Sequence, residues 1–530
     1  MNNFSDQSQT EPAPAAVRTV VVVGGGNAGW LTAGRIAARH KSNTPGGLKV
    51  ILIEAPGIPA IGVGEGTWPT MRSTLLALGI SETEFIRHCD ATFKQGAKFA
   101  GWVNGAADDF YYHPLVLPQG FGKADVAAYW QAKRLQSSAT SSFSQSLCFQ
   151  EALCEQGLAP KTIRSAEYAA VANYAYHLDS AKFTAFLQQH CINKLGVVHL
   201  TDEVIAVHSH ANGDIASVQT RTAGAIAGDL FVDCTGFSAL LLGKHYQIGF
   251  KPCDDVLFID TALAVQVPYP QPDTPIACHT ISTAQEAGWI WDIGLQQRRG
   301  VGYVYASRYC DEQQARATLA RYVGPAIEDL TVRKIAIQSG HRHKFWHRNC
   351  VAVGLSAGFL EPLEASALVL VELSAQMISE QLPAHRGLMD IVADRFNSTF
   401  LYRWEKIIDF LKLHYLLSQR DDSAFWRDNR DPASIPLRLA QQLQLWRSRS
   451  PANADFFSNN EVFPAASYQY VLYGMGFHTD YSYQDYLLDD WDFAQEQFLQ
   501  NERMTQQALA MLPSHRDLIE KIRQYGLSKV

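Results

Sequence analysis

Three glycines and a glutamate near the start of the chain have the types and spacing of a dinucleotide-binding turn. Gly24, Gly26 and Gly29 match the pattern G-x-G-x-x-G, and Glu54 lies further along the chain. In such a turn the first glycine allows a tight bend, the second lets the backbone approach a pyrophosphate, and the third lets the helix pack closely on its strand. The acidic residue accepts hydrogen bonds from ribose hydroxyls. These residues therefore predict binding of FAD or NAD.

This chemistry needs the glycines to join a strand to a helix, and the flanking residues predict both elements. The β-branched run Thr19–Val23 is typical of a strand, residues 31–40 have the apolar spacing of a helix, and residues 50–53 form a second short strand that ends at Glu54. The start of such a helix directs free N–H groups and a partial positive charge at phosphates. The alternative, a glycine-rich turn without a ligand, does not explain why strand, helix and acid occur together.

The rest of the chain predicts an α/β protein with an inserted sheet and a helical C-terminal part. Strand-like runs follow at residues 229–233, 288–293, 302–306 and 350–353. Helical spacing then dominates at residues 367–381, 389–417 and 492–512. We therefore expect a Rossmann-type nucleotide-binding domain into which further segments are inserted.

The composition is that of a folded, soluble protein. Of the 530 residues, 47% are hydrophobic and 18% are charged, which supplies core material and excludes wholesale disorder. Lys and Arg number 45 against 52 Asp and Glu, a net charge of −7, so the chain has no overall attraction to nucleic acid or to an anionic membrane. The mean hydropathy is −0.12, and no apolar run approaches the roughly 20 residues of a membrane helix.

The cysteines and the N-terminal segment indicate the cellular compartment. Nine cysteines are scattered along the chain without a Cys-x-x-Cys pair, which argues against a disulfide framework and against a zinc ribbon. We therefore expect reduced thiols, no metal site and a cytoplasmic protein. Residues 1–18 are rich in Ser, Gln, Pro and Ala, and we expect a disordered tail there rather than a secretion signal.

Several short motifs, spread in order along the chain, carry a resemblance to a known family. The three longest are IGVGEGTWP at residues 61–69, GWIWDI at 288–293 and GLSAGFLEPLE at 354–364. The shorter ones are ATFK at 91–94, YHLD at 176–179, DCTG at 233–236 and RDDSAFW at 420–426. Together, from Val20 to about Arg430, they resemble the flavin-dependent tryptophan halogenases.

The resemblance implies a flavin-monooxygenase-like fold that holds FAD. The chain then divides into the tail at residues 1–18, an FAD-binding and halogenation domain at 19–385, and a mainly helical substrate-side module at 386–530. A separate flavin reductase would supply reduced FAD (FADH₂), which with O₂ and chloride or bromide gives hypohalous acid. A small aromatic substrate, indole or an indole-like compound, is then halogenated. A homodimer is also expected, because dimers are the commonest oligomers.

The resemblance also assigns roles to particular residues. Lys94 would hydrogen-bond hypohalous acid or form a haloamine, and Glu364 would accept from a ring N–H of the substrate and stabilise the cationic intermediate. His113 matches a position that stacks on the substrate ring, and Ser366 and Ala367 match the halide site. Positions that match contacts to FAD are Gly24, Gly26, Asn27, Ala28, Gly29, Glu54, Ala55, Glu65, Val204, Leu355 and Leu368.

Each of the three candidate active-site side chains also has a plainer interpretation. Lys94 alone would be a solvated surface charge, and His113 alone would be a structural histidine. Glu364 would favour the start of the following helix through the helix dipole. Their positions within the motifs favour the catalytic roles for Lys94 and Glu364.

The sequence departs from the family pattern where tryptophan-specific members hold their substrate. The pattern Tyr-Tyr…Glu…Phe-Trp cannot be placed after residue 430, Leu115 stands where Phe is usual, and Ser366-Ala367 replaces the more usual Thr-Gly. A zwitterion that leaves water without matching charges binds weakly, because an unpaired buried charge is strongly unfavourable. We therefore expect a more open site that prefers indole, an indole derivative, or a larger aromatic or peptide-borne substrate over free tryptophan.

Two other functions remain open on the sequence alone. An aromatic hydroxylase uses reduced flavin and O₂ to transfer oxygen directly, usually binds NAD(P)H itself, and has no need of the Lys94–Glu364 pair. A non-catalytic FAD-binding sensor or scaffold would bind FAD tightly and form no halogenated product.

Overall fold

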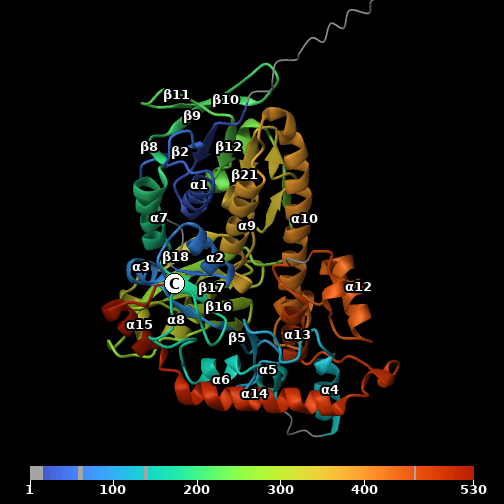
Figure 1. Ribbon diagram of the computed structural model, residues 1–530. Coiled ribbons are helices and arrows are strands. Elements are labelled where there is room, and N and C mark those ends of the chain that lie inside the picture. Colours follow the sequence, from blue (N-terminus) through green and yellow to red (C-terminus); the bar gives the residue numbers. More distant parts are fainter. Residues whose placement is uncertain (1–15, 58–63, 137–140, 459–460, 530) are drawn as a thin grey trace, which may run out of the picture.

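A mainly parallel sheet carries the glycine turn (Figure 1). The computed structural model describes residues 16–57, 64–136, 141–458 and 461–529. The sheet order is β20 (Trp346–His347), β21 (Cys350–Ala352), β12 (Leu230–Asp233), β1 (Thr19–Val23), β2 (Lys49–Glu54) and β8 (Val198–Thr201). All neighbours are parallel except β20 and β21. Val20, Val21 and Val22 are fully buried, as expected for a parallel strand with both faces covered.

Helix α1 (Asn27–Arg39) follows β1 directly after the glycine turn. It packs against α7 (Ser180–Leu195) and α9 (Ser366–Glu380), which Figure 1 shows on either side of it. The predicted order of strand, glycine turn, helix and strand is therefore confirmed. The helix begins at Asn27, four residues before its predicted apolar run, because Gly26 takes the extended N-cap conformation.

A second, mixed sheet lies beyond the first one along the molecule (Figure 1). Its order is β18 (Arg333–Ala336), β14 (Thr261–Pro268), β17 (Arg298–Tyr305), β16 (Gly288–Gly294), β15 (Thr280–Gln285), β5 (Gly96–Ala100) and β6 (Phe110–Pro114). A three-stranded sheet, β3 (Glu65–Gly66), β7 (Ala175–Leu178) and β4 (Thr92–Lys94), adjoins it. Since β4 runs almost directly into β5, and β5 pairs with β6, residues 94 and 113 are brought to one region of the fold.

The C-terminal part is mainly helical, as predicted. Helix α10 (Arg386–Leu416) has 31 residues and packs against β20 at one point and against α13 (Ala465–Gly474) at another. Helix α14 (Trp491–Met511) lies along one end of the molecule over α4 (Val126–Gln136), α5 (Phe143–Leu147) and α6 (Gln150–Glu155) (Figure 1). Helix α15 (His515–Tyr525) packs against α3 (Glu82–His88).

The remaining helices and strands lie outside the two large sheets. The other helices are α2 (Thr70–Ala77), α8 (Glu312–Val323), α11 (Ala424–Asp428) and α12 (Leu437–Trp446). The other strands are β9 (Val204–Ser209), β10 (Ile215–Thr220), β11 (Ala225–Ala227), β13 (Phe250–Pro252), β19 (Gly340–Arg342) and β22 (Gly358–Phe359). None of the helices in the described ranges is both long and apolar enough to cross a membrane.

The N-terminal segment is ordered from Ala16, which shortens the predicted tail. Val17 is buried, and its N–H donates to the carbonyl of Ala384 at 3.0 Å. Residues 1–15 of that predicted tail, and residues 61–63 of the motif at 61–69, lie outside the described residues. The division at residue 385 coincides with the start of α10 at Arg386 and otherwise stays a prediction, since α10 also packs against β20 of the first sheet.

Two glycines of the turn are required by packing alone. A Cβ at Gly24 would lie 2.1 Å from the Cys234 carbonyl oxygen, and Gly24 has a φ of +115°. A Cβ at Gly29 would lie 1.8 Å from the carbonyl oxygen of Gly24. At Gly26, by contrast, a Cβ would meet nothing within 4 Å. The turn is therefore tight at Gly24 and Gly29 and open at Gly26.

This difference predicts that two substitutions change the stability of the ligand-free protein by different amounts. Gly29→Ala should lower the free energy of unfolding by about 2 kcal/mol, because an overpacked methyl forces the backbone apart. Gly26→Ala, its matched control, should leave that free energy within about 0.5 kcal/mol of the wild type. Urea unfolding followed by circular dichroism measures both. Equal stability of the two variants would contradict the packing role of Gly29.

Candidate active site

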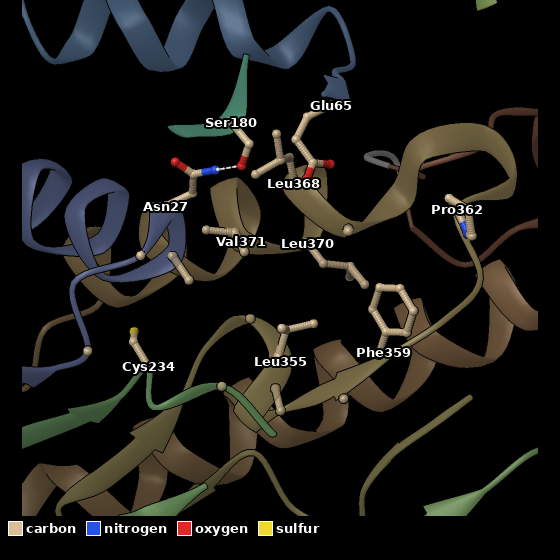
Figure 2. A pocket seen from close by; sticks show the side chains of 18 of the residues that line it. Asn27, Glu65, Ser180, Cys234, Leu355, Phe359, Pro362, Leu368, Leu370 and Val371 are labelled. Carbon is tan, nitrogen blue, oxygen red and sulfur yellow. Dashed lines mark hydrogen bonds between the residues drawn. The ribbon is translucent and has the colours of Figure 1, made fainter. Parts of the chain in front are cut away.

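A cavity of about 850 Å³ runs from the glycine turn to Lys94. Its walls come from the ends of β1 and β2, the starts of α1 and α9, and strands β15 and β16. Figure 2 shows its apolar side, where Leu355, Leu368 and Phe359 project inwards, and the carboxyl group of Glu65 close to Leu368. The predicted cofactor residues that line it are Gly24, Gly26, Asn27, Ala28, Glu54, Ala55, Glu65, Val204, Leu355 and Leu368. Gly29 does not line it and acts through packing.

The glycine turn provides the space and the polar groups that a dinucleotide needs. The free volume at Gly26 lets a phosphate group approach the backbone at the start of α1. A Cβ at Gly25 would lie 2.2 Å from the carboxyl carbon of Glu54, so the absent side chain at Gly25 keeps the Glu54 carboxylate over the turn. Asn27 Nδ2 donates to Ser180 Oγ at 2.9 Å, which ties α1 to α7 (Figure 2). These residues fit FAD.

Lys94 ends β4 at the far side of the cavity and is only 2% exposed. Its Nζ donates to the Thr67 carbonyl oxygen at 3.2 Å and lies 5.7 Å from the ring centroid of Trp68. Burial lowers the pKa of Lys94 to about 8, and the negative charge of Glu364 opposes this change. The Lys94 side chain is therefore a buried amine whose protonation changes near neutral pH.

Gly66 lines the cavity beside Lys94. A Cβ at Gly66 would lie 3.2 Å from Cβ of Ala365 and 3.6 Å from Nζ of Lys94. His177 lies on another side, and its Nε2 is 2.9 Å from the Oγ1 of Thr280, which also lines the cavity. Burial and then the charge of Lys94 hold the pKa of His177 well below its usual value. His177 is therefore neutral when Lys94 is charged.

Glu364 stands on an unusual stretch of backbone. Glu364 and the next residue, Ala365, both have left-handed conformations, with φ of 63° and 55°. Such conformations cost roughly 1 kcal/mol or more each in residues other than glycine, so surrounding contacts must hold them. They reverse the chain just before α9, which places the first residues of that helix, Ser366 and Ala367, on the cavity wall. Free N–H groups at a helix start attract anions, in keeping with the predicted halide position.

The Glu364 carboxylate is held by two imidazoles. Oε1 lies 2.7 Å from Nδ1 of His113 and 3.3 Å from Nε2 of His414. Trp68 Nε1 donates to the backbone carbonyl of Glu364 at 2.8 Å, so Trp68 lies next to both Lys94 and Glu364. Burial favours the protonated acid, but the two imidazoles outweigh it and hold the pKa of Glu364 well below its usual value. Glu364 is therefore a fixed anion.

His414 is a site residue that the sequence analysis did not identify. It lies within α10, is fully buried, and its Nδ1 is 2.5 Å from the hydroxyl oxygen of Tyr111. A lone histidine in a long helix has no local pattern that marks it. Its role follows only from the packing of α10 against β5 and β6, which brings its ring over Phe99 and Tyr111.

A second buried acid, Glu361, lies three residues before Glu364. It is 1% exposed and accepts a hydrogen bond from the hydroxyl of Tyr415 on α10. Burial raises the pKa of Glu361 to about 7. The sequence analysis did not assign it a role, although it belongs to the same motif as Glu364.

Aromatic side chains enclose the far side of the Lys94–Glu364 region. The rings of Trp68, Phe410, Phe463 and Tyr470 all lie within 6.5 Å of the His113 ring, centroid to centroid. Phe463 stacks on Phe410 with ring centroids 3.9 Å apart. This aromatic wall is buried, and neither its four rings nor His113 lines the cavity, which they adjoin through the contact of His113 with Glu364.

The comparisons with known proteins agree with one another. A family model described as tryptophan halogenase matches residues 19–487. The chain is 33% identical to tryptophan 6-halogenase SttH of Streptomyces toxytricini, over 86% of this chain and 89% of that protein. It is 31% identical to tryptophan 7-halogenase RebH of Lentzea aerocolonigenes, over 87% and 90% of the two chains.

Solved structures give the same result. The crystal structure of a tryptophan halogenase from Shewanella frigidimarina matches with a TM-score of 0.92 and 45% identity, over 97% of this chain and 99% of that one. BrvH, a flavin-dependent halogenase from Brevundimonas, matches with a TM-score of 0.84 and 30% identity, over 96% and 99% of the two chains.

Proposed function

Because the chain belongs to the tryptophan halogenase family, we propose that Lys94 and Glu364 direct hypohalous acid to an indole-like ring held by the aromatic wall around His113. The protein is a flavin-dependent halogenase, and its cofactors are FADH₂, O₂ and chloride or bromide. Enzymes of this family receive reduced FAD from a separate flavin reductase. The single observation that carries the residue assignment is that the buried Lys94 and Glu364 side chains line the same cavity and that Trp68 contacts both residues.

When bound at the glycine turn, reduced FAD with O₂ supplies the oxidising equivalents that convert halide to hypohalous acid. The other steps of the reaction depend on residues of the chain. Ser366 and Ala367, at the start of α9, would bind the halide through backbone N–H groups. Glu65 lines the cavity, and burial raises its pKa to about 7, so this acid holds a proton near neutral pH.

The surroundings of Lys94 favour the ammonium form as the active one. Nζ donates to the Thr67 carbonyl and faces the Trp68 ring, and both groups stabilise a cation. An ammonium group that donates to the oxygen of hypohalous acid withdraws electrons from its halogen and makes it more electrophilic. We therefore favour hydrogen bonding over formation of a haloamine.

Glu364 would act on the substrate ring. Its carboxylate remains ionised next to His113 and His414, so it can accept from a ring N–H and stabilise positive charge that develops on the ring. His113 would hold the carboxylate in place and contact the ring at the same time.

The substrate we propose is indole or an uncharged indole derivative. Tyr470, which lies on this wall, has its hydroxyl bonded to the Val116 carbonyl at 2.8 Å, and the carboxylate of Glu461, close to Phe463 in the sequence, accepts from Tyr402. None of the four rings around His113 carries a charge that would match the ammonium or carboxylate group of an amino acid. Direct hydroxylation is not favoured, because the family and the curated relatives are halogenases. Assembly as a homodimer and location in the cytoplasm remain predictions.

The first test removes the amine. Lys94→Ala should abolish halogenated product in an assay with FAD, a flavin reductase, NADH, bromide and indole, because the halogen is no longer directed to the ring. FAD affinity and flavin reoxidation should remain at wild-type values. Lys98→Ala is the matched control, since Lys98 lies on the neighbouring strand and pairs with Glu155. Wild-type product yield from Lys94→Ala would remove Lys94 from the mechanism.

The second test follows pH. A lysine is protonated below its pKa, so the halogenation rate at saturating FADH₂ and bromide should be constant below pH 8 and fall above it, by about tenfold per pH unit, as Lys94 loses its proton. Flavin reoxidation measured in parallel separates this effect from cofactor chemistry. A rate that rises above pH 8 would show that the neutral amine acts instead.

The third test compares substrates. The value of kcat/KM for indole should exceed that for free tryptophan by at least about tenfold, because the aromatic wall offers no partner for two buried charges. 3-Methylindole is the control, since it adds bulk at the same ring position without charge, and it should be turned over like indole. Faster turnover of tryptophan than of 3-methylindole would contradict the substrate assignment.

A further inference from the structure

Two cysteines and a histidine meet in the interior next to the active site, although they are far apart in the sequence. Cys154 lies in α6, and Cys278 and His279 directly precede β15. The two sulfurs and one ring nitrogen of His279 all lie within 4.8 Å of one another. None of the three residues lines the cavity described above. This thiol–imidazole cluster is therefore separate from the cofactor and substrate site.

The cluster is buried, and one of its polar atoms has no hydrogen-bond partner among the described residues. Cys278 is fully buried, Cys154 is 4% exposed and His279 is 7% exposed. Both thiols are free of disulfides. The Nδ1 atom of His279 is buried and has no hydrogen-bond partner among the described residues. A buried polar nitrogen without a hydrogen-bond partner is energetically costly. The imidazole of His279 is therefore available to bind a ligand.

The donor set selects a particular kind of ligand. Two thiolates and an imidazole are ligands typical of Zn²⁺, and tetrahedral zinc with Zn–S bonds of about 2.3 Å separates two sulfurs by about 3.8 Å, within the observed limit. Zn²⁺ bound to two thiolates is electrically neutral, whereas Cu⁺ would leave one negative charge. Neutrality matters in a dry interior, because a net charge there is strongly disfavoured.

We propose that Cys154, Cys278 and His279 bind one Zn²⁺ ion. Binding replaces the two thiol protons with the metal, so two protons are released for each ion bound. Three protein ligands leave one tetrahedral position for a water molecule.

An ion in this cluster would connect two parts of the structure that support the active site. The Cys278 carbonyl accepts from the backbone N–H of Gln95 at 2.7 Å, next to Lys94. On the other side, the hydroxyl of Tyr112 donates to Glu155, the residue after Cys154, and Tyr112 precedes His113. An ion in the cluster would therefore fix α6 and β15 behind the strands that carry Lys94 and His113. This inference concerns a separate site and does not depend on the proposed halogenation roles.

The test measures zinc in the purified full-length protein. Elemental analysis should find about one zinc per chain, or metal-free protein should take up one Zn²⁺ in competition with a chromophoric chelator. Co²⁺ used as a probe should give the charge-transfer absorption of a thiolate-bound ion. Cys154→Ser, Cys278→Ser and His279→Gln should each weaken Zn²⁺ binding by at least about 100-fold. Cys253→Ser is the control, because Cys253 is buried outside the cluster, and it should bind as the wild type does.

The outcomes separate the proposal from its alternatives. Circular dichroism and FAD binding establish whether each variant folds. If a variant does not fold, the Co²⁺ spectrum of the wild type still tests the proposal. A chain that neither contains nor takes up zinc overturns the proposal. So does a Cys154–Cys278 disulfide found by mass spectrometry in the freshly purified protein, or copper bound in place of zinc.

Discussion

The burial of two charged side chains, Lys94 and Glu364, in one cavity is the constraint on which the site depends. Each group loses several kcal/mol of hydration free energy on leaving water, so each needs partners close by. The structure supplies these partners as dipoles and rings: the Thr67 carbonyl and the Trp68 ring on one side, and the His113 and His414 imidazoles on the other. Removal of any one of these partners leaves a charge exposed to an apolar interior. The neighbours are therefore as constrained as the pair itself.

This constraint explains why the site is built from rigid elements. Lys94 and His113 stand on strands of adjoining sheets, and His414 stands on a 31-residue helix. Only Glu364 lies on an irregular segment, and there the left-handed backbone is held by Trp68 from outside and by the start of α9 from within. Strands and helices position side chains more accurately than loops do, which suits a reaction that must place a halogen at one carbon.

The features that could be predicted from the sequence are those that depend on residues close together in the chain. The glycine turn and the strands beside it follow from residue types a few positions apart, and β1 has the predicted bounds. Lys94, Glu364 and His113 could be named only through the family motifs, because no local pattern distinguishes a catalytic lysine from a surface one. His414 and the Cys154–Cys278 contact depend on pairings between distant segments, so neither spacing nor composition points to them. The ordering of Val17 likewise depends on a partner, Ala384, that is far away in the sequence.

Gly66 has no side chain, and this leaves space beside Lys94 in the cavity wall. A methyl group there would lie 3.2 Å from Cβ of Ala365, a tight contact, and 3.6 Å from Nζ of Lys94, an ordinary van der Waals contact. Glycine at this position therefore keeps the space next to the Lys94 amine free, so that the amine remains open to the cavity.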